Sequence, residues 1–206
     1  IPTEKKAAYI NALLKVGFHS IDFGSFVSPK AIPQLKDTKE VLNLLDLSNT
    51  STSLLAIIAN ERGAEDAASF EQIKYLGFPF SVSEEFQKRN TNSTISESMK
   101  RVEEIQRICQ RNGKELVIYI SMGFGNPYGE PWNAGIVTHW VKQLAELGIR
   151  IIQLSDTIGV SNPQNIQQLF SQLIPEFRQI EFGAHLHSRP ENWEEKIKAA
   201  YDHGCR

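Results

Sequence analysis

Two histidines near the C-terminal end of the chain have the spacing of a metal-ligand pair. His185 and His187 follow a short apolar run, residues 180–184, that is typical of a strand. Residues two apart in a strand point to the same face, so the Cβ atoms would lie ~6.6 Å apart at the ~3.3 Å rise per residue. Two neutral imidazoles at that separation can occupy neighbouring positions around one divalent ion. The ordinary alternative is a pair of polar side chains that bond only to backbone.

The composition is that of a globular chain and argues against several function classes. Its 206 residues are 41% hydrophobic and 22% charged, and the formal net charge is −2. No basic run points to nucleic acid or an anionic membrane surface as a partner. No apolar run approaches the ~18 residues of a membrane span, and we recognise no signal peptide. Cys109 and Cys205 do not make a disulfide framework, so we expect a reducing, intracellular setting.

Helical and strand patterns alternate along the chain. Glycines follow four of the helical segments, at Gly17, Gly113, Gly148 and Gly204, where a left-handed residue commonly ends a helix. The predicted helices cover residues 2–16, 38–45, 61–69, 94–112, 136–147, 163–173 and 191–201, and the predicted strands cover 18–23, 53–58, 72–76, 115–121, 150–154 and 180–184.

This strict alternation predicts a parallel sheet with helices outside it, an α/β fold. A seventh strand would begin at Cys205, and one more strand before Ile1 would give the eight of a (β/α)8 TIM barrel. We therefore expect residues 1–206 to be a single TIM-barrel catalytic domain, a fragment of a longer chain that lacks the first strand and most of the eighth. A doubly wound open sheet is the alternative, but no Gly-x-Gly-x-x-Gly follows any predicted strand.

Polar residues gather where the predicted strands end. Asp22, Ser121, Asp156, His185 and His187 all lie at or just after the C-terminal ends of apolar runs. In a barrel, that end of the strands carries the active site. The sequence therefore predicts a site built from several strand ends.

A series of motifs runs through almost the whole chain in a fixed order. Together they resemble 3-hydroxy-3-methylglutaryl-CoA lyase and its superfamily of metal-dependent lyase barrels. The motifs are Ser25-Phe26-Val27-Ser28-Pro29-Lys30, Ile32-Pro33-Gln34, Asp37, Glu40-Val41-Leu42, Ser83-Glu84, Phe86, Lys88-Arg89-Asn90, Gly125, Pro127-Tyr128, Asp156-Thr157-Ile158-Gly159-Val160 and His185-Leu186-His187.

The resemblance implies a role for individual residues. The two histidines match the family's metal-binding histidines, and the first of them also lies close to the reacting centre. Asp156 matches a strand-end aspartate that faces the substrate, and Asp22 stands where the lyases have a glutamate near the metal. The implied catalytic residues are His185, Asp156 and Asp22, the substrate-binding residues are Ser25 and Gln153, and the metal ligands are His185 and His187.

The activity that the resemblance implies is a retro-Claisen cleavage. The substrate would be 3-hydroxy-3-methylglutaryl-CoA, split to acetyl-CoA and acetoacetate, a step of leucine catabolism and ketone-body formation. The cofactor would be a divalent metal, Mg²⁺ or Mn²⁺, which suits mixed imidazole and oxygen ligation. The partners would be the acyl-CoA and a second copy in a homodimer, with no nucleic acid and no membrane. The location would be cytoplasmic, or the mitochondrial matrix in a eukaryote.

Some positions depart from the family pattern and leave alternatives open. After the second histidine the lyases have Asp-Thr-Tyr-Gly, whereas this chain has Ser188-Arg189-Pro190-Glu191. The family's Arg-Asp pair and its catalytic-cysteine loop would lie outside this chain, because Cys205 comes too early for that loop. Asp156 could instead cap the helix that follows it, and Asp22 could be a salt-bridged barrel residue. A Claisen-condensing acyltransferase of the isopropylmalate or homocitrate synthase type, and an inactive barrel that binds metal or acyl-CoA, are the alternative functions.

Overall fold

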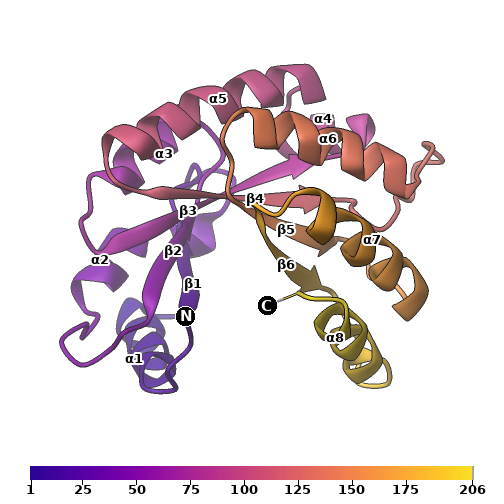
Figure 1. Ribbon diagram of the computed structural model, residues 1–206. Coiled ribbons are helices and arrows are strands. Elements are labelled where there is room, and N and C mark those ends of the chain that lie inside the picture. The colour runs from indigo at the N-terminus through magenta and orange to yellow at the C-terminus, as the bar shows by residue number, and fades with distance from the viewer. Residues whose placement is uncertain (206) are drawn as a thin grey trace. The chain divides into compact units, whose positions relative to one another are not determined.

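The computed structural model describes residues 1–205, in which parallel strands alternate with helices (Figure 1). The chain divides into two compact units. The first comprises Ile1–Phe78 and Arg107–Glu115, and the second comprises Pro79–Gln106 and the residues from Leu116 onwards. Three elements contribute residues to both units: the strands β3 (Ile73–Ser81) and β4 (Glu115–Ser121) and the helix α5 (Ile95–Arg111).

The first unit is built on three strands. β1 pairs with β2 and β2 pairs with β3, both in parallel. Leu54, Ile58 and Leu76 are completely buried, as expected for strands covered by helices. The elements that begin in this unit are α1 (Thr3–Leu14), β1 (Ser20–Ser25), η1 (Pro33–Leu35), α2 (Thr38–Asn43), β2 (Ser53–Ile57), α3 (Glu61–Ala68) and β3 (Ile73–Ser81).

The second unit carries the histidine pair. β4 pairs with β5 and β5 with β6, again in parallel, and α7 and α8 pack against each other and against β6 (Figure 1). The apolar stripe of α7 is completely buried from Ile166 to Leu173. The remaining elements are α4 (Glu84–Thr91), α5 (Ile95–Arg111), β4 (Glu115–Ser121), α6 (Ala134–Glu146), β5 (Ile151–Asp156), α7 (Pro163–Glu176), β6 (Glu181–Leu186) and α8 (Trp193–Asp202).

Each strand lies next to its neighbour in sequence, in the order β1-β2-β3-β4-β5-β6. A doubly wound sheet reverses its strand order at a switch point, and no reversal occurs among the described strands. The predicted α/β class and parallel pairing are therefore confirmed, and the consecutive order is consistent with a TIM barrel. Of the strand expected to begin at Cys205, Cys205 itself is not in a strand and Arg206 lies outside the described residues.

The glycines expected to end helices adopt the required conformation. Gly17, Gly113, Gly148 and Gly204 have φ between 64° and 95°, a region that side chains disfavour. The predicted helices and strands are all present, with ends that differ by a few residues. β3 is longer than expected because it continues through Gly77 and Pro79, residues that commonly interrupt strands.

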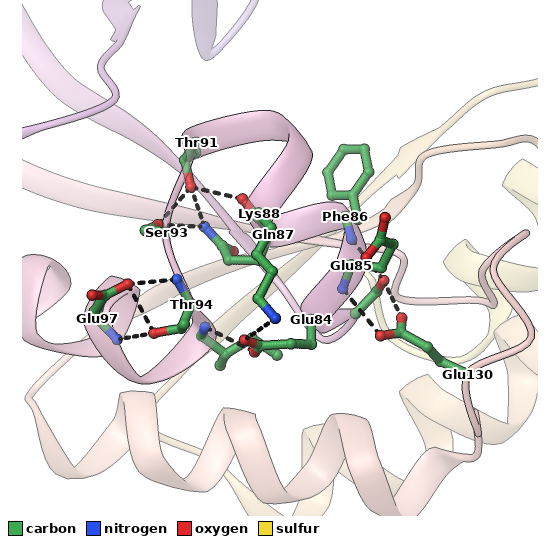
Figure 2. A network of polar contacts seen from close by, with 12 residues as sticks. Glu84, Glu85, Phe86, Gln87, Lys88, Thr91, Ser93, Thr94, Glu97 and Glu130 are labelled. Carbon is green, nitrogen blue, oxygen red and sulfur yellow. Dashed lines mark hydrogen bonds and ion pairs between the residues drawn. The ribbon is translucent and has the colours of Figure 1, made fainter.

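The sequence pattern does not predict the helix α4 (Glu84–Thr91). Only Gln87 of its eight residues is buried, so α4 lacks the apolar stripe that predicts a helix. Polar contacts hold it instead (Figure 2). Glu130 accepts hydrogen bonds from the Ser83 hydroxyl and from the Glu85 backbone N–H, at 3.0 Å for the latter. At the other end, the Thr91 hydroxyl bonds to Ser93 and accepts from the Gln87 amide (Figure 2).

A reciprocal pair of asparagines begins α7 and gives the first testable prediction. The Asn162 side chain accepts from the Asn165 backbone N–H at 3.0 Å, and the Asn165 side chain accepts from the Asn162 N–H at 2.9 Å. Asn162→Ala leaves a helix N–H without its acceptor, so we expect the free energy of unfolding to fall by about 1 kcal/mol. Urea unfolding measures the change. The exposed Gln164→Ala is the control, and equal unfolding midpoints for the two variants would contradict the prediction.

Neither cysteine forms a disulfide. Burial raises the pKa of the Cys109 thiol to about 12, so it stays protonated and unreactive near neutral pH. Cys109 is 1% exposed, so it is a packing residue of the core. Across residues 1–205, no helix combines the length and apolar character that crossing a lipid bilayer requires.

Candidate active site

The histidine pair lies at the C-terminal end of β6. His185 is the penultimate residue of the strand and His187 follows it directly. The ring centroids lie 5.3 Å apart with an interplanar angle of 62°, and both side chains are exposed to solvent. The prediction that the two imidazoles project to the same side is confirmed. Their separation suits two neighbouring positions around one ion.

Neighbouring groups fix the orientation of both rings. The Nδ1 atom of His187 lies 2.9 Å from the backbone oxygen of Thr157, which can only accept a hydrogen bond. Nδ1 therefore carries the proton, and Nε2 of the neutral ring is left with a free lone pair for a ligand. The ring of Tyr119, on β4, meets the His185 ring edge to face at 5.6 Å and 84°.

The electrostatic surroundings keep His185 neutral. Desolvation by the surrounding protein, and secondarily the proximity of His187, lower the pKa of His185 below its usual range although the side chain still reaches solvent. A neutral imidazole is the form that binds a metal. The histidine pair offers two nitrogen donors. Among residues 1–205, no third His, Cys, Asp or Glu side chain is placed to complete a group of three around a metal ion.

Asp156 and His185 point to opposite faces of the sheet. The parallel register sets Ser155 beside His185 and Asp156 beside Leu186, so the Asp156 and His185 side chains leave opposite faces of the sheet. The Asp156 carboxylate is buried, with only 1% of the residue exposed, and forms an ion pair of 2.9 Å with Lys196. The structure shows this internal ion pair, and the contact of Asp156 with substrate stays a prediction.

The hydrogen bonds of Asp156 are already complete. Oδ1 accepts from the backbone N–H groups of Val160 and Ser161, at 2.7 and 3.0 Å. Oδ2 accepts from the Ser161 hydroxyl at 2.5 Å and from the Lys196 ammonium. With two partners on each oxygen, the carboxylate has its usual hydrogen-bond positions filled, so this geometry favours a positioning role.

Sequence patterns did not single out two residues near the histidine pair, Lys196 and Ser155. Lys196 is buried with Ala199 and Ala200 on the inner face of α8, and its only sequence signal is a charge at helical spacing from two small residues. Ser155 is 6% exposed, and its hydroxyl has no hydrogen-bond partner among the described residues. Because Ser155 lies beside His185 in the register, its hydroxyl is placed near the histidine pair.

Gln153 lies one step further back on the same face of β5. It is paired with Gly183 in the register, and its side chain occupies the space that a Cβ at Gly183 would fill. Glycine at 183 is therefore what lets the amide cross the neighbouring strand. Gln153 lines a cavity of about 710 Å³ together with residues of β6 and α8.

The first unit carries Asp22 and Ser25 on β1. The Ser25 hydroxyl accepts from the Val27 N–H at 3.1 Å, and Ser25 lines a cavity of about 460 Å³ with Lys36 and Lys39. Burial raises the pKa of Asp22 to about 6, and a hydrogen bond from the Gly24 backbone partly opposes this shift. Part of the residue nevertheless reaches solvent. A carboxyl with a pKa near neutrality is a candidate general base.

The shifted pKa of Asp22 gives a prediction with a definite sign. A carboxyl whose folded pKa is raised contributes stability below its unfolded pKa of 3.8, and that contribution is lost as the pH rises through about 6. We expect Asp22→Asn to be more stable than the unsubstituted protein at pH 7, by ~1 kcal/mol once solvent screening is discounted. The difference should vanish near pH 4. Urea titrations at both pH values measure it, Asp66→Asn is the exposed control, and a difference that grows toward low pH would contradict it.

Comparison with known proteins shows which family this chain resembles. The family model described as HMGL-like matches residues 1–190. The chain is similar to hydroxymethylglutaryl-CoA lyase YngG of Bacillus subtilis, at 32% identity over 187 residues, which are 91% of this chain and 62% of that protein. The chain spans 55–62% of the length of the first bacterial and vertebrate relatives it matches.

Solved structures agree with this family. The HMG-CoA lyase of Bacillus subtilis superposes with a TM-score of 0.92 at 29% identity, over 99% of this chain and 68% of that one. An HMG-CoA lyase from Acinetobacter baumannii, in complex with coenzyme A and 3-methylmalate, superposes with a TM-score of 0.91 at 30% identity, over 100% of this chain and 67% of that one. The chain belongs to the HMGL-like family.

Proposed function

We propose that the protein is a carbon–carbon lyase that cleaves 3-hydroxy-3-methylglutaryl-CoA to acetyl-CoA and acetoacetate. The observation that carries this proposal is the pair of imidazoles at the C-terminal end of β6, held side by side in a chain of the HMGL-like family. The similar structure from Acinetobacter baumannii binds coenzyme A, which supports an acyl-CoA substrate. The relatives that share most of this chain are named as lyases for this substrate.

His185 and His187 are the residues that would hold a Mg²⁺ or Mn²⁺ ion. The fit rests on the 5.3 Å separation of their rings and on the commitment of Nδ1 of His187 to Thr157, which leaves Nε2 available. Two nitrogen donors leave further positions for oxygen ligands, the preference of both ions. When bound, the ion would supply a Lewis acid for the tertiary hydroxyl of the substrate.

A side chain of the protein would accept the proton from the tertiary hydroxyl of the substrate. Because its pKa is about 6, the Asp22 carboxyl is half ionised near pH 6 and mostly ionised at pH 7, and its role as the general base is proposed from the resemblance. His185, whose lone pair is assigned to the ion, is proposed to act at the reacting centre through that ion. General bases of this kind contribute ~10²–10⁴-fold to the rate.

Substrate binding is proposed for Ser25, Gln153 and Ser155. Ser25 and Gln153 line cavities of their respective units, whereas Ser155 offers a buried hydroxyl that no described residue engages. A buried hydroxyl without a partner is costly, so a ligand atom that accepts its hydrogen bond would bind favourably.

The finer architecture is also proposed. The consecutive strand order and the TM-scores support β1 to β6 as the second to seventh strands of an eight-stranded TIM barrel, with residues 1–206 in its single catalytic domain. A homodimer, and a cytoplasmic or mitochondrial-matrix location, are proposed from the resemblance alone.

An assay of acetoacetate release tests the function. The full-length protein is incubated with 3-hydroxy-3-methylglutaryl-CoA and Mg²⁺ or Mn²⁺, and release that EDTA abolishes is the expected result. The rival reaction, Claisen condensation, is assayed in parallel. The protein is incubated with acetyl-CoA and a 2-oxo acid, and release of the free CoA thiol is followed. Condensation without cleavage would assign the protein to the synthases, and metal binding without either turnover would make it an inactive barrel.

A further inference from the structure

A lysine that is almost completely buried lies next to the histidine pair. Lys196 is 1% exposed, and its Nζ atom donates to Oδ2 of Asp156 at 2.9 Å and to the backbone oxygen of His187 at 3.1 Å. Lysine is among the residues least often fully buried, and it is buried when it is paired. Its second bond shows that this pair does more than neutralise Asp156, because it reaches the backbone of a histidine that would bind metal.

Asp156 provides a rigid anchor for this contact. Its other hydrogen bonds go to the backbone N–H groups of Val160 and Ser161 and to the Ser161 hydroxyl. The carboxylate therefore cannot move without breaking these bonds to the loop that follows β5. Lys196, on α8, bonds to this anchored carboxylate and to the His187 backbone oxygen, and so holds the end of β6 in place. The end of β5, the end of β6 and the helix α8 are tied together at one ammonium group.

The same loop contacts the His187 ring and runs close to the His187 backbone. The Thr157 backbone oxygen accepts from Nδ1 of the His187 ring, 2.9 Å away. Gly159 has a φ of +72°, and a Cβ there would lie 3.5 Å from the His187 backbone oxygen, so the loop backbone runs close beside that residue. His187 is therefore held at its ring by Thr157 and at its carbonyl by Lys196.

We propose that Lys196 is a positioning residue for metal binding, which acts through His187. Without the ammonium group, the His187 carbonyl loses its donor and residue 187, which lies beyond the last ladder position of β6, can rotate. Rotation breaks the bond to Thr157, so the ring no longer keeps its proton on Nδ1 and its lone pair on Nε2. Lys196 contacts neither metal nor substrate. This inference rests on the proposed metal binding by His187.

Metal affinity of the full-length protein is the test. The dissociation constant for Mn²⁺ alone is measured by electron paramagnetic resonance for the unsubstituted protein, Lys196→Met, Lys198→Met and His187→Ala. Lys198 lies on the same helix and is largely exposed, in an ion pair with Asp202, so it is the matched control. Groups that orient metal-bound histidines typically change affinity by ~10–100-fold, and we expect Lys196→Met to weaken Mn²⁺ binding at least ~10-fold while Lys198→Met leaves it unchanged.

A second measurement separates positioning from stability. Nitrogen-15 NMR of the histidine rings reports the tautomer, and we expect His187 to carry its proton on Nδ1 in the unsubstituted protein and to populate both tautomers in Lys196→Met. If Lys196→Met fails to fold, the double variant Lys196→Met/Asp156→Asn, which leaves no lone buried charge, takes its place. In the unsubstituted protein, saturation with Mg²⁺ should also shift the Lys196 Nζ signal and leave that of Lys198 unmoved.

The outcomes distinguish this inference from the proposed function. If His187→Ala abolishes Mn²⁺ binding while Lys196→Met keeps the same affinity and tautomer, Lys196 is only structural and the inference is overturned. An Mg²⁺ titration that leaves the Lys196 signal unmoved would overturn it as well. If His187→Ala binds Mn²⁺ as tightly as the unsubstituted protein, the proposed metal site itself fails.

Discussion

Replacing His187 with alanine is expected to lower kcat/KM for 3-hydroxy-3-methylglutaryl-CoA cleavage by at least ~10³-fold, or about 4 kcal/mol of transition-state stabilisation. The substitution removes one of the two nitrogen donors that the structure places side by side. Without the ion, the tertiary hydroxyl keeps its high pKa and the substrate loses its fixed orientation. Acetoacetate release over a range of substrate concentrations at saturating Mn²⁺ measures kcat/KM and kcat, and the loss should appear mainly in kcat.

A histidine outside the site serves as the control for this experiment. His139 is exposed on α6 and its ring packs against Trp140, with centroids 5.0 Å apart. His139→Ala should keep activity within about a factor of two, because neither metal nor substrate is proposed to contact it. Equal activity of His187→Ala and His139→Ala would remove the histidine pair from the mechanism.

Lys196→Met is expected to lower the free energy of unfolding by about 3–5 kcal/mol, the usual result of breaking a buried ion pair from one side. The substitution leaves the Asp156 carboxylate buried without its counter-charge and the His187 carbonyl without its donor. Both the side chain of Lys196 and that of Asp156 are at most 1% exposed, so water cannot replace the lost partner. Urea unfolding followed by circular dichroism measures the change.

Two further variants show whether the ion pair is the cause. Lys198→Met removes an exposed charge from the same helix and should leave the unfolding midpoint unchanged. Lys196→Met/Asp156→Asn should be less destabilised than the sum of the two single variants, because the second substitution removes the stranded charge. Additive losses would mean that the two side chains do not act as a pair.

The local order of the fold follows directly from the sequence. The predicted helices and strands are present because apolar residues at periods of 3.6 and 2 select one buried face, and glycine at Gly113 and Gly148 supplies the positive φ that ends a helix. The same period of 2 places His185 and His187 on one side of β6. The helix α4 escaped prediction because polar contacts to Glu130 stabilise it where an apolar stripe does not.

By itself the sequence determined the α/β alternation, the side-by-side histidines and the resemblance that led to the family, since each depends on residues close together along the chain. Only the tertiary structure decided the partners of those residues. The interstrand register put Ser155 beside His185 and turned Asp156 to the opposite face, and helix packing brought Lys196 to Asp156 across 40 positions of sequence. The physical reason is that a side chain's face repeats with local period, whereas its neighbour across a sheet or beneath a helix is set by packing between segments distant in sequence.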